Sequence, residues 1–262
     1  MLQSAMSFRV DLNCDMGESF GAYTIGHDAE VVRHITSANI ACGFHVSDPI
    51  VMKETVRLCK DHNVAIGAHP GYPDLAGFGR REMNLADDDI IQNVLYQIGA
   101  LSAFTAFFKV PLRHVKLHGA LYNHVMKHEN LFLGIIRTVK EAFGDLLIFT
   151  LGTPETKIMK KRLAGKGHRL ILEAFPDRNY ADDGFLLPRK YPEAVIKESE
   201  LIAERAISMV KDGTLKTVNG HILDIEIDTL CVHGDNPESI KAASMIRHYA
   251  IRENIAVKAP GI

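Results

Sequence analysis

Histidines stand at the ends of several short apolar runs in this sequence. His69 ends the run VAIGAH, His118 ends RHVKLH, and His233 ends LCVH. Imidazole groups, together with carboxylates and ammonium groups, transfer protons and stabilise developing charge in active sites. One such histidine is more often a structural residue, but repetition at equivalent positions predicts a functional site.

The alternation of side chains along a strand places further polar residues beside these histidines. Residues i and i+2 share a face of a strand, so Asp11 and Asn13 lie together, with Asp15 next in phase if the strand continues. The same rule groups His45 with Gly43, His69 with Gly67, Lys116 with His118, Glu173 with Asp177, and Cys231 with His233 and Asp235. Asp11, Lys116 and Glu173 precede their strand ends among apolar neighbours, so we expect them to contact one another.

The elements that position these residues alternate between strands and helices. Apolar, β-branched runs predict strands at 8–13, 37–42, 63–69, 113–118, 146–152, 169–175 and 227–233. Helical periodicity predicts helices over 48–62, 87–108, 129–143, 154–165, 199–212 and 237–253. Capping residues Asp48, Thr153 and Asn236 each precede a proline, which is typical of a helix start. This alternation predicts a parallel sheet whose polar strand ends meet at one edge.

A closed barrel fits this pattern better than an open sheet. No G-x-G-x-x-G follows the first strand, which argues against a dinucleotide-binding open sheet. We therefore predict an α/β fold, a parallel (β/α) barrel of about seven strands, with 255–258 too short to settle an eighth. Asn219-Gly220 predicts a type I′ β-hairpin inserted near 214–225. No linker rich in Pro, Gly or Ser divides the chain, so 1–262 is expected to be a single domain.

Composition excludes several classes of function. The 30 Lys and Arg residues nearly balance the 32 Asp and Glu residues without a basic block, which argues against nucleic acid as a partner. No apolar run approaches eighteen residues and the first residues lack the apolar core of a signal peptide, so no membrane association is expected. The four cysteines are widely spaced, which favours a reducing, cytoplasmic location.

Two features of the sequence leave alternatives open. His, His and Asp from different strands could bind a divalent metal, but no H-x-x-x-H or H-E-x-x-H spacing is present, so the ligands stay unknown. The loop DLAGFGRRE (74–82) ends in Arg80 and Arg81, which could clamp an anion as a lid or simply be solvated. No phosphate-binding G-x-x-x-x-G-K-[ST] motif is present.

Six long motifs together resemble the LamB/YcsF family. They are VDLNCDMGESFG (10–21), ANIACGFHVSDP (38–49), VAIGAHPGYPDLAGFGRR (64–81), VKLHGALYN (115–123), EAFPDRNYADDG (173–184) and CVHGDNP (231–237). The resemblance runs in order from about residue 8 to the end of the chain. Leu117, Pro176 and Glu193 depart from the family pattern, and none of them is a proposed site residue.

The resemblance implies a barrel similar to that of the glycoside hydrolase/deacetylase superfamily. It also implies the A subunit of a 5-oxoprolinase, an enzyme that opens 5-oxoproline (pyroglutamate) to L-glutamate with ATP hydrolysis. The activity is then shared with separate B and C subunits, and ATP is a co-substrate of the complex. The lack of a familiar ATP loop in this chain agrees with ATP chemistry on the partners.

This interpretation assigns hypothetical roles to the strand-end residues. Water attacks the activated ring, with Asp11, Asp15 or His69 as general base and His118 or His233 as general acid. Lys116, Arg178 or the backbone N–H groups at the Pro49 and Pro237 helix starts hold the carboxylate or phosphoryl oxygens. The remaining substrate contacts are expected from Asn13, His45, Arg80, Glu173, Asp177 and Asp235. The alternatives are a stand-alone metal-dependent deacetylase or amidohydrolase, and a non-catalytic binding subunit.

Overall fold

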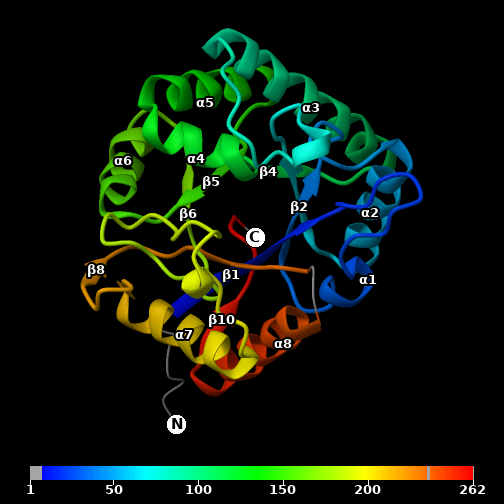
Figure 1. The fold of residues 1–262 in the computed structure, drawn as a ribbon. Coiled ribbons are helices and arrows are strands. Elements are labelled where there is room, and N and C mark those ends of the chain that lie inside the picture. The colour runs from blue at the N-terminus through cyan, green and yellow to red at the C-terminus, as the bar shows by residue number, and fades with distance from the viewer. Residues whose placement is uncertain (1–7, 235–236, 262) are drawn as a thin grey trace.

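A closed barrel of parallel strands forms the centre of the molecule (Figure 1). The computed structural model describes residues 8–234 and 237–261. The barrel strands are β1 Phe8–Met16, β2 Ser37–Ala41, β3 Ala65–His69, β4 Leu112–Lys116, β5 Leu147–Leu151, β6 Leu170–Ala174 and β9 Thr229–Val232. Pairing of β9 with both β6 and β1 closes the ring, so the predicted seven-stranded parallel barrel is confirmed.

The first strand has two partners along one edge. Its start pairs with β10 (Ile255–Val257), where Phe8 lies opposite Ile255. From Asp11 onward the same edge pairs with β9, where Asp11 lies opposite Thr229. The eighth strand that the sequence left unsettled is therefore a short addition below β9 rather than a full member of the barrel.

Helices surround the barrel on its outside (Figure 1). They are α1 Asp28–Val31, α2 Pro49–Asp61, α3 Asp87–Phe108, α4 Gly119–Lys127, α5 Glu129–Phe143, α6 Pro154–Ala164, α7 Ser199–Asp212 and α8 Pro237–Arg252, with 3-10 turns η1 Leu75–Gly77 and η2 Pro192–Ala194. Asp48 accepts N–H bonds from Ile50 and Val51, and Thr153 forms a capping box with Thr156, as predicted for both starts. The third predicted cap, Asn236, lies outside the described residues.

The helix α3 is long and apolar enough to cross a membrane by length and composition, with a mean hydropathy of 1.3 over its most apolar window. It is the one helix of this kind in the part of the chain that the structure describes. In the molecule it packs against α2, α5, β3 and β4. Its buried Gln97 bonds both backbone groups of Gly71. The apolar residues of α3 therefore pack against the barrel and its neighbouring helices, and part of the helix surface stays exposed.

The predicted hairpin near 214–225 is present as β7 Thr214–Lys216 and β8 Ile222–Asp224. Its turn is not of the predicted type I′, which requires two successive positive φ angles. Only Gly220 has a positive φ, +85°, and its N–H bonds the carbonyl of Thr217. The loop is thus a type I turn followed by a glycine bulge. The Asn219 side chain donates to Asp182, which favours this longer loop.

The barrel interior is polar, and the main hydrophobic core lies outside it. Alternation along β1 turns Asp11, Asn13 and Asp15 inward, whereas the intervening apolar residues pack against the helices. A small separate apolar cluster of Leu147, Phe149 and Ile171 fills the interior on the side of β5 and β6. The inward charged side chains are therefore held in place by two apolar regions. One is the core between the strands and the helices, and the other is the small cluster inside the barrel.

Candidate active site

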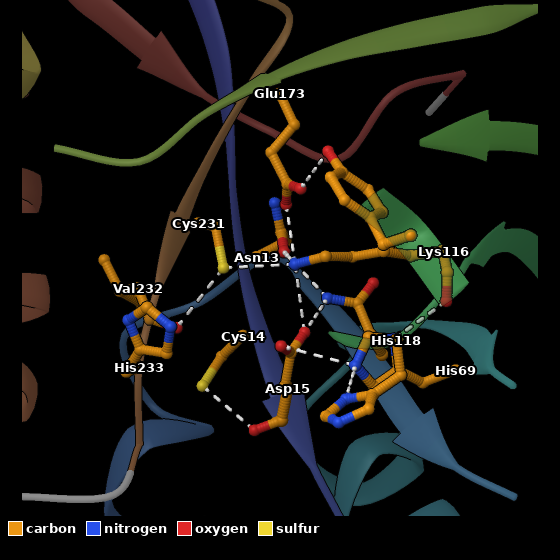
Figure 2. A network of polar contacts seen from close by, with 12 residues as sticks. Asn13, Cys14, Asp15, His69, Lys116, His118, Glu173, Cys231, Val232 and His233 are labelled. Carbon is orange, nitrogen blue, oxygen red and sulfur yellow. Dashed lines mark hydrogen bonds and ion pairs between the residues drawn. The ribbon is translucent and has the colours of Figure 1, made fainter. Parts of the chain in front are cut away.

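The ammonium group of Lys116 is the centre of a buried network at the carboxyl ends of the strands (Figure 2). Its Nζ lies 2.8 Å from Glu173 Oε1, 3.0 Å from Asp15 Oδ1 and 3.1 Å from Cys231 Sγ. Burial favours the neutral amine, but Asp15 and Glu173 outweigh it and hold the pKa of Lys116 well above its usual value. The predicted contact between Lys116 and Glu173 is confirmed.

Asp11 lies deeper in the barrel and does not contact Lys116 or Glu173, so that part of the prediction is wrong. Its carboxylate accepts hydrogen bonds from Thr36, Ser37 and Thr229 at 2.6–2.8 Å. Ser37 and Thr229 are the first residues of β2 and β9, and Thr36 directly precedes β2, so this layer lies below the mouth. Burial raises the pKa of Asp11 to about 6 despite these bonds.

Asp15 connects this network to the histidines. Its Oδ1 accepts a bond from Asn39 as well as from Lys116, and its Oδ2 lies 3.3 Å from His69 Nε2. Burial favours the protonated acid, but His69 and Lys116 outweigh it, and the pKa of Asp15 lies well below its usual value. The residue is therefore an ionised carboxylate at the mouth, as a general base or an electrostatic anchor requires.

Two backbone carbonyls fix the orientation of the next histidines. The Nδ1–H of His69 donates to the carbonyl of Lys116 at 2.8 Å, and the Nε2–H of His118 donates to the carbonyl of Phe78 at 2.9 Å. The remaining ring nitrogens, His69 Nε2 and His118 Nδ1, face each other at 3.0 Å. Burial lowers the pKa of His118 to about 3, so its ring is neutral.

His45 lies against this pair without a hydrogen bond of its own. Its ring stacks on that of His118 with centroids 3.8 Å apart, and neither of its buried nitrogens has a hydrogen-bond partner. Gly79, at φ +62°, passes so close that a Cβ there would lie 2.8 Å from the Cβ of His45 and 2.9 Å from Cδ2 of His118. The loop 70–82 therefore packs directly over the stacked histidines.

Glu18, from the loop after β1, completes a cluster with these histidines. The ligating atoms of Glu18, His45, His69 and His118 all lie within 4.8 Å of one another. Burial and the neighbouring Asp15 raise the pKa of Glu18 to about 7. One carboxyl group and three imidazoles are a donor set that could hold a metal ion.

A second pair of acid–base groups lies across the mouth. His233 Nδ1 and Asp177 Oδ2 are 2.5 Å apart, and Figure 2 places His233 on the opposite side of Asp15 from His69. Burial opposes the charged form of His233, but Asp177 prevails and raises the pKa of the histidine. A histidine oriented by a buried carboxylate is a common general acid–base arrangement.

The predicted arginines differ in their surroundings. Arg178 is buried and donates to the backbone carbonyls of Ala194 and Leu187, so it holds the segment that contains η2. Arg81 pairs with Asp74 within its own loop. Arg80 is exposed, with its guanidinium 5.0 Å from the ring centre of Phe78. Of the two arginines predicted to clamp an anion, Arg80 therefore lies at the rim of the mouth, whereas Arg81 is paired with Asp74. Asp235, a predicted substrate contact, lies outside the described residues.

Four residues of the site were not predicted from the sequence. Tyr122 of α4 donates to Glu173 Oε2 at 3.1 Å, and Asn39 Oδ1 lies 2.8 Å from His114 Nε2. Alternation along the strand could have identified Asn39 and His114. Asn39 shares a strand face with Ser37, and His114 shares one with Lys116. Tyr122 lies one turn into a helix that was not predicted. Glu18 follows the end of β1, where alternation no longer indicates direction.

Charged and acid–base groups at the carboxyl ends of a parallel barrel are the arrangement of an α/β-barrel enzyme. The family model described as LamB/YcsF family matches residues 10–261, and the chain belongs to this family. It is 48% identical over 249 residues to the A subunit of 5-oxoprolinase from Pyrococcus horikoshii, covering 95% of this chain and 96% of the relative.

Comparison with solved structures also finds proteins with this fold. The lactam utilization protein from Thermus thermophilus superposes with a TM-score of 0.87 at 43% identity, covering 96% of this chain and 100% of that one. A putative cellobiose-phosphate cleavage protein from Enterococcus faecalis shares the fold, with a TM-score of 0.58 at 13% identity, covering 95% of this chain and 96% of that one.

Proposed function

We propose that this chain acts as the A subunit of a 5-oxoprolinase and takes part in opening 5-oxoproline to L-glutamate with ATP hydrolysis, together with separate B and C subunits. The observation that carries the proposal is near full-length identity of 48% to a protein of that name. The charged barrel mouth supports an enzymatic role, since pure binding pockets are mostly apolar with few polar anchors. We also infer a cytoplasmic location, which the four free cysteines favour. The family match over residues 10–261 supports a single domain over 1–262.

The chemistry of the substrate explains the need for ATP. A five-membered lactam closes readily because its amine is held beside its own carboxyl group, which is a large effective-molarity advantage. Opening the ring in the useful direction therefore gains from coupling to ATP hydrolysis. We assign the ATP chemistry to the partner subunits, because this chain has no familiar phosphate-binding loop.

The mouth supplies groups for the hydrolytic half of the reaction. In our proposal the partners phosphorylate the lactam oxygen, and water then attacks the ring carbon. Asp15 takes the proton of that water, because it is ionised and held in place by Lys116 and His69. As the C–N bond breaks, His233, oriented by Asp177, gives a proton to the departing nitrogen and leaves an acyl phosphate. A second water then hydrolyses this acyl phosphate, which releases L-glutamate and phosphate. Each such proton transfer is typically worth about 10²–10⁴-fold in rate.

Other predicted residues take supporting roles in this proposal. Lys116 forms ion pairs with Asp15 and Glu173, rather than binding the substrate itself. Arg80 at the rim is our candidate for the substrate carboxylate. Asp11 positions the layer below the mouth through Thr229, which also accepts a bond from Asn13.

The test is reconstitution with candidate B and C subunits. The chain is supplied with 5-oxoproline and ATP, alone and in the full mixture, and both glutamate and phosphate are followed. We expect glutamate only in the full mixture. Turnover by this chain alone without ATP would instead identify a stand-alone amidohydrolase, an alternative that the cluster around His45 favours.

Matched variants separate a catalytic role from a binding role. His69→Ala and His118→Ala should abolish activity of the complex while the chain remains folded. His124→Gln is the control, since this histidine bonds Tyr72 outside the network of the mouth. Full turnover with His69→Ala and His118→Ala would contradict the assignment and favour a non-catalytic binding role.

A further inference from the structure

We propose that Glu18, His45, His69 and His118 form a binding site for one divalent transition-metal ion, with Zn²⁺ as the first candidate. The site lies at the barrel mouth beside Asp15. This inference does not rest on the proposed 5-oxoprolinase function, because metal binding is measured on the chain alone.

The first observation is a conflict between two lone pairs. A carbonyl oxygen can only accept, so the bonds to the carbonyls of Lys116 and Phe78 require His69 to carry its proton on Nδ1 and His118 to carry its own on Nε2. In neutral rings this leaves lone pairs on His69 Nε2 and His118 Nδ1, which face each other at 3.0 Å. Two acceptors at hydrogen-bond distance need a proton or a metal ion between them, and the Asp15 carboxylate, 3.3 Å from His69 Nε2, favours either positive charge.

The spacing fits a shared metal ion. Two nitrogens bound to one ion at ~2.0–2.1 Å, with an angle of ~90–109° at the metal, lie ~2.9–3.4 Å apart. The 3.0 Å between His69 Nε2 and His118 Nδ1 falls in this range. The backbone carbonyls on the opposite ring nitrogens are also the usual outer partners of metal-bound histidines, where they fix the tautomer and the ring orientation.

The second observation distinguishes a metal from a shared proton. A proton between His69 and His118 would satisfy that pair but would leave both buried nitrogens of His45 without a partner. A buried polar atom without a partner costs about 1–3 kcal/mol, so the position of His45 needs an explanation. A metal ion gives one of these nitrogens a ligand role and brings in the carboxyl group of Glu18 as well.

The donor set indicates the kind of metal. Imidazole nitrogens prefer zinc and similar transition metals, whereas Mg²⁺ and Ca²⁺ prefer oxygen ligands. The four donor atoms lie within 4.8 Å of one another, whereas tetrahedral ligands are ~3.4 Å apart, so binding draws the more distant donors inward. When bound, such an ion would act as a Lewis acid at the barrel mouth.

The test uses the untagged full chain without partner subunits. Metal content is measured by mass spectrometry after purification, and the chelator-treated protein is titrated with Zn²⁺ by calorimetry and with Co²⁺ by absorbance. We expect about one Zn²⁺ per chain and a Co²⁺ spectrum of a protein-bound ion. His45→Gln and His118→Gln should each weaken Zn²⁺ binding at least about 100-fold, whereas His124→Gln should bind as the unchanged chain does.

Circular dichroism establishes that each variant is folded, and the double variant Glu18→Gln with His45→Gln provides a second set of lost ligands. Absence of Zn²⁺ and Co²⁺ binding by the unchanged chain would overturn the proposal and leave a proton shared by His69 and His118. Binding that survives in folded His45→Gln, His118→Gln and the double variant would overturn it too, because the ion would then lie elsewhere. Neither result decides whether the complex opens 5-oxoproline, which the reconstitution measures separately.

Discussion

Replacing Lys116 with methionine should strongly destabilise the barrel. Methionine keeps an unbranched chain of similar length but removes the only ammonium group that contacts both Asp15 and Glu173 among the described residues. The side chains of Lys116 and Glu173 are 3% and 0% exposed, so water cannot replace the lost partner. Lys116→Met therefore leaves two carboxylates in the barrel interior with their compensating charge removed.

The magnitude follows from the burial of the pair. An ion pair at 2.8 Å is worth about 6 kcal/mol at an effective dielectric constant of 20, before the cost of desolvation is subtracted. Removing one partner of a buried pair typically costs about 3–5 kcal/mol, because the other charge stays buried. Each kcal/mol lowers the melting temperature of a large domain by about 2–4 °C. We therefore expect a loss of about 6–20 °C.

Urea denaturation and calorimetry of three variants measure this effect. Lys116→Met and Glu173→Gln are each compared with the double variant, which removes both charges. The double variant should be more stable than the sum of the single losses predicts, by about 1–3 kcal/mol. A loss below about 1 kcal/mol for Lys116→Met, or strict additivity in the double variant, would refute the view that the ammonium compensates these carboxylates.

Three further predictions follow from the site. Asp177→Asn removes the charge that raises the pKa of His233, so the limb of the pH–rate profile set by this histidine should move to lower pH; an unmoved limb would exclude His233 from the proton transfers. The pKa of Asp11 is about 6 in the folded chain against an ordinary value of 3.8, so its contribution favours folding below about pH 4 and is lost as pH rises towards 6. Asp11→Asn should remove this component, worth up to about 3 kcal/mol, and a stability difference independent of pH between about 4 and 7 would contradict the shift. Gly79→Ala introduces a Cβ 2.8 Å from the Cβ of His45 at a residue with positive φ, so it should lower the activity of the complex. Gly99→Ala on α3 is the control and should leave the activity unchanged, because no atom lies within 4 Å of the added Cβ. Equal activities of the two variants would show that the loop tolerates the clash.

Much of the fold could be predicted from the sequence because strands and helices alternate with clear boundaries. The helices over 87–108, 129–143 and 199–212 were predicted with the bounds that the structure has. The predicted phase of Asp15 was also correct, since β1 continues to Met16. Such success reflects strong local signals, namely β-branched runs for strands and apolar periodicity for helices.

The remaining errors have physical causes. The helix α4 starts directly at Gly119 without a side-chain cap, so the sequence carried no start signal for it. Asp11 was expected beside Lys116 because both face inward, but alternation gives the face of a strand and not the depth in the barrel. Parallel register decides that depth, and Asp11 lies opposite Thr229, two positions below Cys231.

Pairing of the first strand with the last ones also constrains how the chain can be made. One edge of β1 can pair with β2 soon after both are synthesised. Its other edge pairs with β9 and β10, which follow more than two hundred residues later. Until those residues leave the ribosome, the inward carboxylates of β1 lack part of their hydrogen-bonding surroundings, including Thr229 for Asp11. Closure of the barrel is therefore a late, long-range event, slow by the usual dependence of folding rate on sequence separation. Until then one edge of the growing sheet is unpaired, and an unpaired sheet edge favours aggregation.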